Sequence, residues 1–333
     1  MMEPFNEPKV SVVITCYNLG RFLAEAIQSV RRQTYKNFEI IVVNDCSIDN
    51  TKEVLENIQN KEELKIINLE KNLGQFGAFL EGLKVSSGQF VVMLDADDIL
   101  LPDFLSVSLD VHMKTSVAFT STAQFEIDEN STIISLNSNA SPTFKNEGFE
   151  DKIKSLDEIF NLSRLNENYE VKVLDIKKCP FGSWNWNPTS SALMRRAPLE
   201  YLLKYKTPQD WKKGADKIVF SFLHLIGGSA TISAPLMAYR RHNTNLSSAN
   251  PVLGNFRYLK PETIKLYVSY NKRIRQDVLR FIFGNYSYFC SQFNPLNVRK
   301  MIFRVIFSFD RNTIKRIIKS FFVNRINRYK LFQ

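Results

Sequence analysis

The first 130 residues alternate short apolar runs with segments of helical periodicity. The runs read KVSVVITCYN, NFEIIVVND, ELKIINLE, QFVVMLDAD and SVAFTSTAQF. Between them lie helix-like segments at residues 21–33, 51–59, 75–85 and 102–113. Runs of β-branched residues without polar alternation are typical of strands covered on both faces. Repeated strand–helix alternation therefore predicts an α/β fold with a doubly wound, mostly parallel sheet.

The rest of the chain has a different composition. Residues 131–180 are polar and irregular, with one expected helix at 156–162. A helical stretch near 216–227 comes before a return strand that ends in PLMAYRRHNTNLS. After Pro251 the chain becomes rich in Phe, Ile, Lys and Arg at helical spacing. We therefore divide the chain into residues 1–130, 131–254 and a C-terminal helical extension at 255–333.

The cysteines and the N-terminus bear on the compartment. The four cysteines, Cys16, Cys46, Cys179 and Cys290, are far apart and form no CxxC pair. This spacing argues against a zinc site and a disulfide framework, so a reducing cytosol is expected. The N-terminus is neither basic nor apolar, and no run of about 18 uncharged apolar residues occurs. We expect a cytoplasmic protein without a spanning helix.

Three carboxylates, Asp95, Asp97 and Asp98, follow the apolar run VVML directly. In an open parallel sheet, ligands bind beyond the carboxyl ends of the strands. Asp95 and Asp97 project to the same side of an extended chain, where their repulsion is costly without a nearby cation. Hard carboxylate oxygens suit Mg²⁺ or Mn²⁺, which bridge nucleotide phosphates. The alternative is that Asp98 caps the helix near Pro102 and the other two are solvated.

Other phosphate chemistries fit less well. Phosphatases of the haloacid dehalogenase type also carry DxD after a strand, but on the first strand and with a Thr two residues later. Here the strand is the fourth, and Ile99 occupies that place. No GxGxxG follows the first strand and no GxxxxGK[ST] loop occurs, which disfavours a dinucleotide site and a P-loop.

Two long segments together resemble a known family. SVVITCYNLGRFLAEAIQSVRRQTYKNFEIIVVNDCSIDNT and NLGQFGAFLEGLKVSSGQFVVMLDADDILLPDFL are similar to the nucleotide-binding half of the family-two inverting glycosyltransferases of GT-A fold. The resemblance covers about 105 residues, with a weaker continuation to about Ser248. It implies that residues 1–130 bind a nucleotide sugar and that residues 131–254 bind the acceptor.

The resemblance also implies roles for single residues. Asp97 would hold Mn²⁺ or Mg²⁺ on the diphosphate, Asp95 the ribose hydroxyls, and Asp45 the base. The residues implied in nucleotide binding are Thr15, Tyr17, Asn18, Asp45, Asp95 and Ala96. The chain departs from the family pattern at Asn44 and Cys46, where a DDGS-like turn is usual, so the contacts to the base are less certain than the metal site.

The second half resembles the segment that carries the catalytic base. An inverting transfer needs a base opposite the leaving diphosphate to take the proton of the acceptor hydroxyl. KKGADKIVFSFLHLIGG aligns Asp216 with the Asp of the family's Glu-Asp pair, and Ala215 with its Glu. We predict Asp216 as the base, with Asp210 as the reserve candidate. The alternative is that Asp216 only complements the helix dipole.

Two further features of this half have open interpretations. His242 in YRRHNTNLS would ligate the metal, or would bind phosphate beside Arg240 and Arg241, unless it is structural. Trp184 and Trp186 in GSWNWNP would stack on an acceptor sugar or belong to the local core. No QxxRW sequence occurs, so a processive synthase is not expected.

The C-terminal extension holds the charge of the chain. Residues 255–333 contain 17 Lys+Arg against 3 Asp+Glu, a local net charge of +14. The whole chain carries +10, so residues 1–254 carry −4. Two apolar stripes occur at helical spacing: Val298, Met301, Ile302, Val305, Ile306 and Phe309, then Ile314, Ile317, Ile318, Phe321 and Phe322. Basic residues beside such stripes favour an anionic membrane interface. Packing on the catalytic domain or on a second copy is the alternative, and no nucleic-acid motif is present.

These features together predict a metal-dependent inverting glycosyltransferase. The donor would be a nucleotide-diphosphate sugar, UDP-linked, and the acceptor a glycan or lipid-linked sugar in cell-surface polysaccharide synthesis. The protein would be peripheral on the inner face of the membrane, with a homo-oligomer left open. Two alternatives stay open: a nucleotide-sugar-binding protein with a degenerate base site, kept by Ala215, and a nucleotidyl- or phosphoryl-transfer enzyme with the same metal site.

Overall fold

The computed structural model covers the chain and describes most of its first 242 residues. The described residues are 7–58, 63–137, 158, 160, 169–174, 185–204, 214–242, 245, 276, 278–292 and 294–307. The expected helix at 156–162 lies outside them except for positions 158 and 160. Trp184 and Asp210 also lie outside the described residues.

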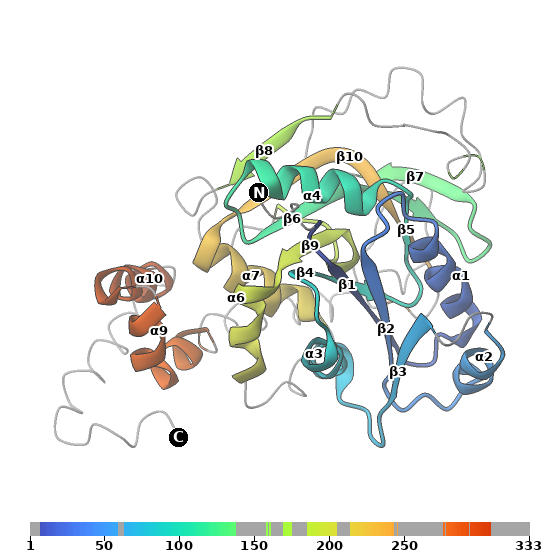
Figure 1. The fold of residues 1–333 in the computed structure, drawn as a ribbon, viewed down its shortest axis with the longest axis horizontal. Coiled ribbons are helices and arrows are strands. Elements are labelled where there is room, and N and C mark those ends of the chain that lie inside the picture. Colours follow the sequence, from blue (N-terminus) through green and yellow to red (C-terminus); the bar gives the residue numbers. More distant parts are fainter. Residues whose placement is uncertain are drawn as a thin grey trace, which may run out of the picture.

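The first half forms the parallel part of a ten-stranded sheet (Figure 1). Its strands are β1 (Val10–Cys16), β2 (Phe38–Asn44), β3 (Leu64–Asn68) and β4 (Phe90–Asp95). They lie in the order β3-β2-β1-β4, and every neighbouring pair is parallel. The doubly wound α/β fold predicted from the alternating pattern is confirmed.

Helices cover both faces of these strands, which explains their unbroken apolar runs. The first four helices are α1 (Gly20–Arg31), α2 (Thr51–Asn57), α3 (Gly74–Val85) and α4 (Phe104–Lys114). Val12 and Ile14 share one core cluster with α1, α2 and α4, whereas Val13 shares the other with α3. Successive strand residues point to opposite faces, so apolar side chains are needed at every position.

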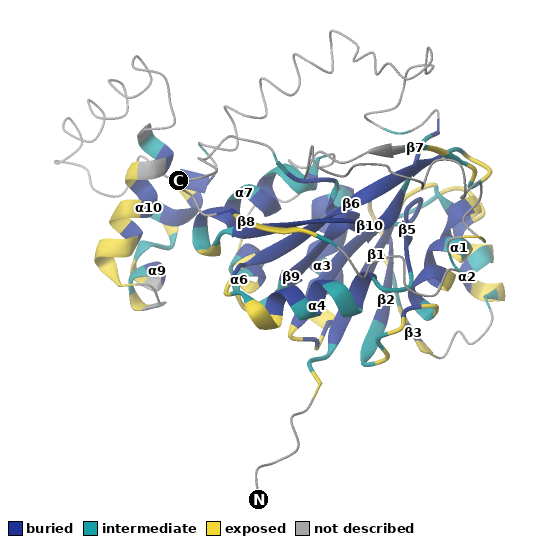
Figure 2. Cartoon of the chain, turned by 90° about the horizontal axis from the view of Figure 1, so that it is seen from above, coloured by how far each residue is buried: buried dark blue, intermediate teal, exposed yellow. Residues whose placement is uncertain are grey.

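Further strands, two of them from before residue 130, extend the same sheet with mixed directions. The remaining strands are β5 (Ile99–Leu100), β6 (Phe119–Ile127), β7 (Ile133–Asn137), β8 (Val171–Leu174), β9 (Ala192–Arg195) and β10 (Ser229–Arg240). β9 lies antiparallel between β4 and β6, and β10 runs parallel to β6. Strands from both sides of residue 130 therefore pair in one sheet, and Figure 2 shows their buried residues side by side.

A group of short helices packs on the face that α3 covers. They are α6 (Arg196–Glu200), η3 (Tyr201–Lys204) and α7 (Ala215–Gly227), whereas the short 3₁₀ helix η2 (Thr189–Ser191) leads directly into β9. Trp186 belongs to this core, since it is 2% exposed, lies against Phe119 and donates a hydrogen bond from Nε1 to Ser229. The interpretation of Trp186 as local core is therefore confirmed.

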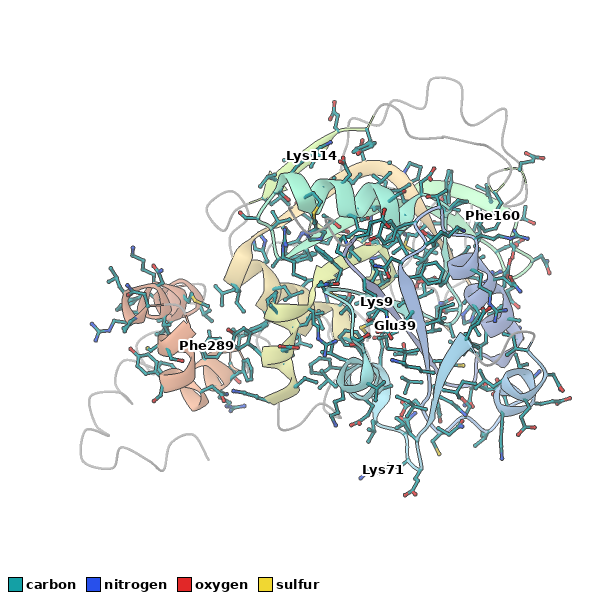
Figure 3. All side chains as sticks on the ribbon, viewed as in Figure 1. Lys9, Glu39, Lys71, Lys114, Phe160 and Phe289 are labelled. Carbon is teal, nitrogen blue, oxygen red and sulfur yellow. The ribbon has the colours of Figure 1, made fainter. Side chains whose placement is uncertain are left out.

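The described part of the C-terminal extension contains α9 (Tyr286–Gln292) and α10 (Pro295–Phe307), beside α6 and α7 (Figure 1). Phe289 of α9 stacks on Tyr201, with ring centroids 5.4 Å apart (Figure 3). Val298, Met301, Ile302 and Val305 are buried in the same core cluster as α7. The first apolar stripe as far as Ile306 thus packs on the core around α7, whereas Phe309 and the second stripe lie outside the described residues. No helix among the described residues has the length and apolar character to cross a bilayer.

Candidate active site

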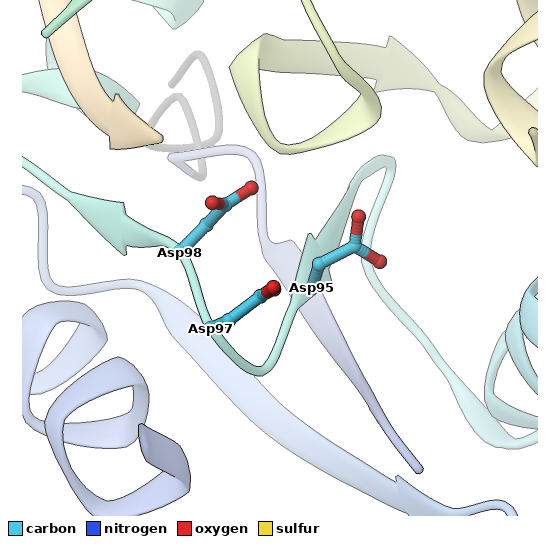
Figure 4. A group of neighbouring side chains, drawn as sticks. All are labelled: Asp95, Asp97 and Asp98. Atoms are coloured by element: carbon cyan, nitrogen blue, oxygen red, sulfur yellow. The ribbon is translucent and has the colours of Figure 1, made fainter. Parts of the chain in front are cut away.

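The ends of parallel strands bring the predicted acids to one edge of the sheet. β1 and β4 lie side by side in register, with Thr15 opposite Asp95. Asp95 is the last residue of β4, and Asp97 and Asp98 lie in the sharp turn that leads into β5 at Ile99 (Figure 4). We call these three residues together the acidic turn. The predicted acidic cluster at the strand ends is therefore present.

Asp95 is held by two side chains from different elements. The amide Nε2 of Gln75 donates to Asp95 Oδ1 at 2.8 Å and to Oδ2 at 2.9 Å, and Thr15 Oγ1 donates to Oδ1 at 3.2 Å. The pKa of Asp95 is raised to about 7, mainly by burial and then by the charges of Asp97 and, less strongly, Asp216. The hydrogen bonds from Gln75 and Thr15 oppose this shift because they favour the ionised form.

Asp97 contacts the segment that follows β10. His242 Nε2 lies 2.8 Å from Asp97 Oδ2, and Asn245 Nδ2 donates to the same oxygen at 3.1 Å. The His242 ring is buried and lies 5.1 Å from the ring of Phe22. The structure thus brings together the two residues that the sequence suggested as metal ligands. Asn245 was not predicted, because an Asn in NTNLS carries no distinctive local signal.

Asp98 has a different role from the one suggested as an alternative. It is fully buried, and its Oδ1 accepts the backbone N–H of Arg240 at 3.1 Å. It does not cap a helix, because α4 begins only at Phe104, after Asp103. Burial raises the pKa of Asp98 well above its ordinary value, and the charges of Asp97 and Asp95 add to this shift.

Arg240 fixes the turn that carries the acids. Its side chain is 1% exposed, and its Nε donates to the backbone carbonyl of Asp97 at 2.9 Å. The same guanidinium pairs with Glu25 of α1 at 2.6 Å and donates to Ser131 at 2.8 Å. An arginine fork with several fixed acceptors restricts the turn strongly. Arg240 therefore acts here as a structural residue and not as an exposed phosphate ligand.

The three carboxylates have the chemistry of a hard-cation site. Each of Asp95, Asp97 and Asp98 presents an oxygen, and these atoms all lie within 4.8 Å of one another. Their mutual repulsion contributes to the raised pKa of Asp95 and of Asp98. A divalent cation offsets this repulsion and prefers all-oxygen ligands. The residues present therefore fit Mn²⁺ or Mg²⁺.

The predicted base-binding Asp45 lies at the end of β2 and supports α3. It is 2% exposed, and its two oxygens accept the backbone N–H groups of Leu73, at 2.6 Å, and Gly74, at 2.8 Å. A carboxylate at a helix N-terminus satisfies unpaired N–H groups and the positive end of the helix dipole. Gly74 has φ 75°, a backbone angle that favours glycine. The structure shows this supporting role, and contact with a base stays a prediction.

The loops after β1 and β2 are tied to each other. The Asn18 N–H donates to Ser47 Oγ at 3.0 Å, and Asn18 Oδ1 accepts the N–H of Ile48 at 2.8 Å. Asn18 has φ 56°, a left-handed angle that Asn tolerates better than most residues. Tyr17 beside it is 47% exposed, so its ring is available to a ligand. Ala96 is buried, and its N–H donates to the carbonyl of Thr15 at 3.1 Å.

Asp216 lies in the first turn of α7, and the start of this helix is connected to Asp95. Burial raises the pKa of Asp216, and its Oδ1 accepts the N–H of Lys217 at 2.9 Å. The backbone N–H of Ala215 donates to Gln75 Oε1 at 3.2 Å, while the other end of that amide binds Asp95. The predicted base thus lies near the acidic turn, and Gln75 was not predicted.

The comparisons with known proteins agree with this geometry. A family model described as Glycosyl transferase family 2 matches residues 11–203, more than half of the chain. An uncharacterized glycosyltransferase of Nostoc sp. is 30% identical over 238 residues, which are 71% of this chain and 66% of that protein. An Escherichia coli protein, UDP-Glc:alpha-D-GlcNAc-diphosphoundecaprenol beta-1,3-glucosyltransferase WfgD, is 34% identical over 126 residues, 38% of this chain and 49% of that protein.

Solved structures show the same fold. The crystal structure of S. aureus TarS 1-349 superposes with a TM-score of 0.55 at 17% identity, over 91% of this chain and 73% of that one. Its complex with UDP-GlcNAc gives 0.51 at 16% identity, over 90% and 79%. The expected GT-A fold is thereby confirmed. The chain spans just under two thirds of the Nostoc protein and 31% of a Haemophilus influenzae glycosyltransferase. The match over residues 11–203 nevertheless shows that this chain belongs to glycosyl transferase family 2.

Proposed function

We propose that this chain is a metal-dependent, inverting glycosyltransferase that uses a UDP-sugar. The observation that carries the proposal is the turn of three carboxylates at the strand ends, with the partly buried Asp216 near it. The donor class is hexosyl or N-acetylhexosaminyl, and the acceptor is a glycan or lipid-linked sugar of a cell-surface polysaccharide. The TarS complex with UDP-GlcNAc and the glucosyltransferase activity that the name of WfgD states support this choice.

The donor lies across the sheet edge in this proposal. Asp95 accepts hydrogen bonds from the ribose hydroxyls, and Thr15, Tyr17, Asn18 and Asp45 surround the uridine. Asp97 and His242 would hold Mn²⁺ or Mg²⁺ at the diphosphate. When bound, the cation neutralises charge on the diphosphate leaving group.

Asp216 is the general base of the transfer. It takes the proton from the acceptor hydroxyl as that oxygen bonds to the anomeric carbon and the bond to the diphosphate breaks on the opposite face. Burial raises the pKa of Asp216, which makes its ionised form a better proton acceptor than an exposed carboxylate. The configuration at the anomeric carbon is thereby inverted.

The site of action is the inner face of the membrane, with the protein bound peripherally from the cytoplasm. The name of WfgD gives its acceptor as alpha-D-GlcNAc-diphosphoundecaprenol, whose lipid part resides in a bilayer. The charge of +14 in residues 255–333 favours an anionic surface. Both observations support a membrane-bound acceptor.

A thermal-shift screen of nucleotide sugars with Mn²⁺ tests the donor. A ligand that binds only the folded state raises the melting temperature. At a ligand concentration a hundredfold above Kd, the free energy of unfolding rises by about 2.7 kcal/mol. UDP-glucose and UDP-N-acetylglucosamine are expected to raise it, and GDP-mannose is the control. Product NMR then reports the anomeric configuration, and retention would contradict the proposed inversion.

The same assay separates the two alternatives. Donor binding without turnover, with any acceptor, would indicate a nucleotide-sugar-binding protein with a degenerate base site, as the Ala215 departure allows. Turnover that yields UMP or a sugar phosphate, and that survives Asp216→Asn, would indicate nucleotidyl or phosphoryl transfer.

A further inference from the structure

Helix α10 has a second apolar face, opposite its buried stripe. Leu296 is 58% exposed and Phe303 is 56% exposed. Residues 296, 300 and 303 are four and three apart, so they share one side of the helix. In Figure 2 the exposed part of α10 lies on the side away from α7. The core therefore accounts for one face of α10, and Leu296 and Phe303 lie on the other face, each more than half exposed.

The flanks of this outward face are basic. Lys300 lies between Leu296 and Phe303 along the helix, and both Arg299 and Lys300 are exposed. Apolar residues bordered by Lys and Arg are typical of helices that lie in an anionic membrane interface. Residues 255–333 as a whole contain 17 Lys+Arg against 3 Asp+Glu. Charge complementarity thus favours an anionic bilayer over a second copy, which would place like charges together.

We propose that the outward face of α10 docks on an anionic bilayer, with Leu296 and Phe303 in the headgroup region. Arg299 and Lys300 bind the acidic headgroups. This inference rests on the proposed function, in which the acceptor is lipid-linked. The buried stripe that the sequence suggested for the membrane is not the contact face.

Vesicle flotation of the full chain tests this surface. Wild-type protein is expected to float with vesicles of phosphatidylglycerol and phosphatidylcholine at low salt, and to float less at high salt, because salt screens exposed charges. Leu296→Ser with Phe303→Ser is expected to reduce the bound fraction to that seen with pure phosphatidylcholine. Val85→Ser with Met113→Ser is the matched control, because these residues are 45% and 52% exposed elsewhere on the surface.

Three results would overturn this proposal: no flotation of the wild type, equal flotation of both double variants, or a change from dimer to monomer in light scattering for the α10 variant alone. The assay contains no donor, so its failure is distinct from a failure of the proposed function. Turnover on a short-chain, water-soluble acceptor without vesicles reports that function separately.

A second inference concerns Gln75, and its observation is independent of α10. The side-chain amide of Gln75 connects the carboxylate of Asp95, at the end of β4, to the backbone of Ala215, the first residue of α7. Ala215 lies 140 positions from Gln75 in the sequence. The orientation of this amide is fixed by both partners, because a flipped amide would place Oε1 against the Asp95 carboxylate. Gln75 is the second residue of α3, directly after Gly74.

We infer that Gln75 is a positioning residue that sets Asp216 relative to the donor site. Ala215 stands where the family resemblance places a Glu, and its N–H is the group that Gln75 accepts. Gly214, with φ 75°, gives the chain the turn that presents this N–H. A misplacement of about 1 Å in a catalytic group costs about a hundredfold in rate. This inference also rests on the proposed function.

A double-mutant cycle with Asp216→Asn tests the role of Gln75. Gln75→Met has a similar length but makes no hydrogen bonds, and is expected to lower kcat by about tenfold or more. In an Asp216→Asn background the same change is expected to have little further effect on kcat, because the group that it positions is gone. Gln75→Glu keeps an oxygen for the Ala215 N–H but places a second carboxylate against Asp95, so it is not expected to restore kcat relative to Gln75→Met.

The matched control is Gln33→Met. Gln33 is a buried glutamine with partners of its own, because its amide donates to the carbonyls of Ser29 and Leu101 and accepts the N–H of Leu105. This variant is expected to lower the melting temperature without changing kcat. The inference is wrong if Gln75→Met leaves kcat unchanged, or if its effect multiplies with that of Asp216→Asn. A wild-type protein without donor binding or turnover would instead refute the proposed function, and this inference with it.

Discussion

At the scale of residues, the acidic turn is a balance between repulsion and fixed partners. Each carboxylate has a different set of contacts: Gln75 and Thr15 on Asp95, His242 and Asn245 on Asp97, and the backbone of Arg240 on Asp98. Burial, and then the repulsion among these carboxylates, raises the pKa of Asp95 and Asp98. A site organised in this way suits a divalent cation.

Asp97→Asn is expected to abolish the stabilisation of the protein by UDP in the presence of Mn²⁺ and to reduce turnover. The fold is expected to persist, because the residue lies in a turn at the edge of the sheet and an amide fills the same space. Differential scanning fluorimetry with Mn²⁺, and with chelator, measures both effects. Asp103→Asn is the control, since Asp103 lies just before α4 and outside the acidic turn. Equal turnover in chelator and in Mn²⁺ would contradict the metal dependence.

Single residues also show where the sequence was informative. Asp95, Asp97 and His242 were predictable because the first two follow an apolar strand directly and the third lies in a recurrent family segment. The contacts of Gln75 with Ala215, of Asn245 with Asp97 and of Arg240 with Asp97 were not predictable, because each joins residues 140 to 148 positions apart and no local pattern encodes such a pair. Asp98 was open to misinterpretation because a helix cap is a local pattern, whereas its partner is the distant Arg240 backbone.

At the scale of elements, α7 and β10 carry the second half of the site to the first. β10 pairs with β6 over its length, which brings His242 back to the acidic turn. α7 presents Asp216 in its first turn, where a carboxylate is favoured by the helix dipole. The helices and strands of the first half were predictable from periodicity, whereas the antiparallel β9 was not, because its partners β4 and β6 lie far upstream.

Asp216→Asn is expected to lower kcat by about a hundredfold or more with little change in donor affinity, the usual scale for a positioned base. The pH profile provides a second readout. A base acts only when ionised, so activity is present above its pKa and is lost as pH falls through it. Because burial raises the pKa of Asp216, the acid limb of kcat should lie above the ordinary value of 3.8. Asp216→Asn should remove this limb, and near-normal kcat would transfer the role to Asp210 or abolish it.

At the scale of the whole molecule, one sheet joins strands from both sides of residue 130, and the described part of the extension packs on the same core. α9 and α10 share a core cluster with α3 and α7, so this part of the extension is integrated with the catalytic region. The amphipathic pattern identified the apolar stripe of α10 but not what covers it, since burial against α7 and burial in lipid require the same side chains. The outward face of α10 could be identified only after the structure had shown which side of the helix is buried.

The central claim is that this chain transfers a sugar from a UDP-linked donor in a metal-dependent step. The most direct measurement is the release of free UDP from UDP-glucose or UDP-N-acetylglucosamine, with and without a polyprenyl-diphosphate-linked N-acetylglucosamine acceptor. We predict release that requires both acceptor and Mn²⁺ or Mg²⁺, that is lost in Asp97→Asn, and that falls by about a hundredfold in Asp216→Asn. UDP release that is the same in chelator, or unchanged in both variants, would contradict the claim.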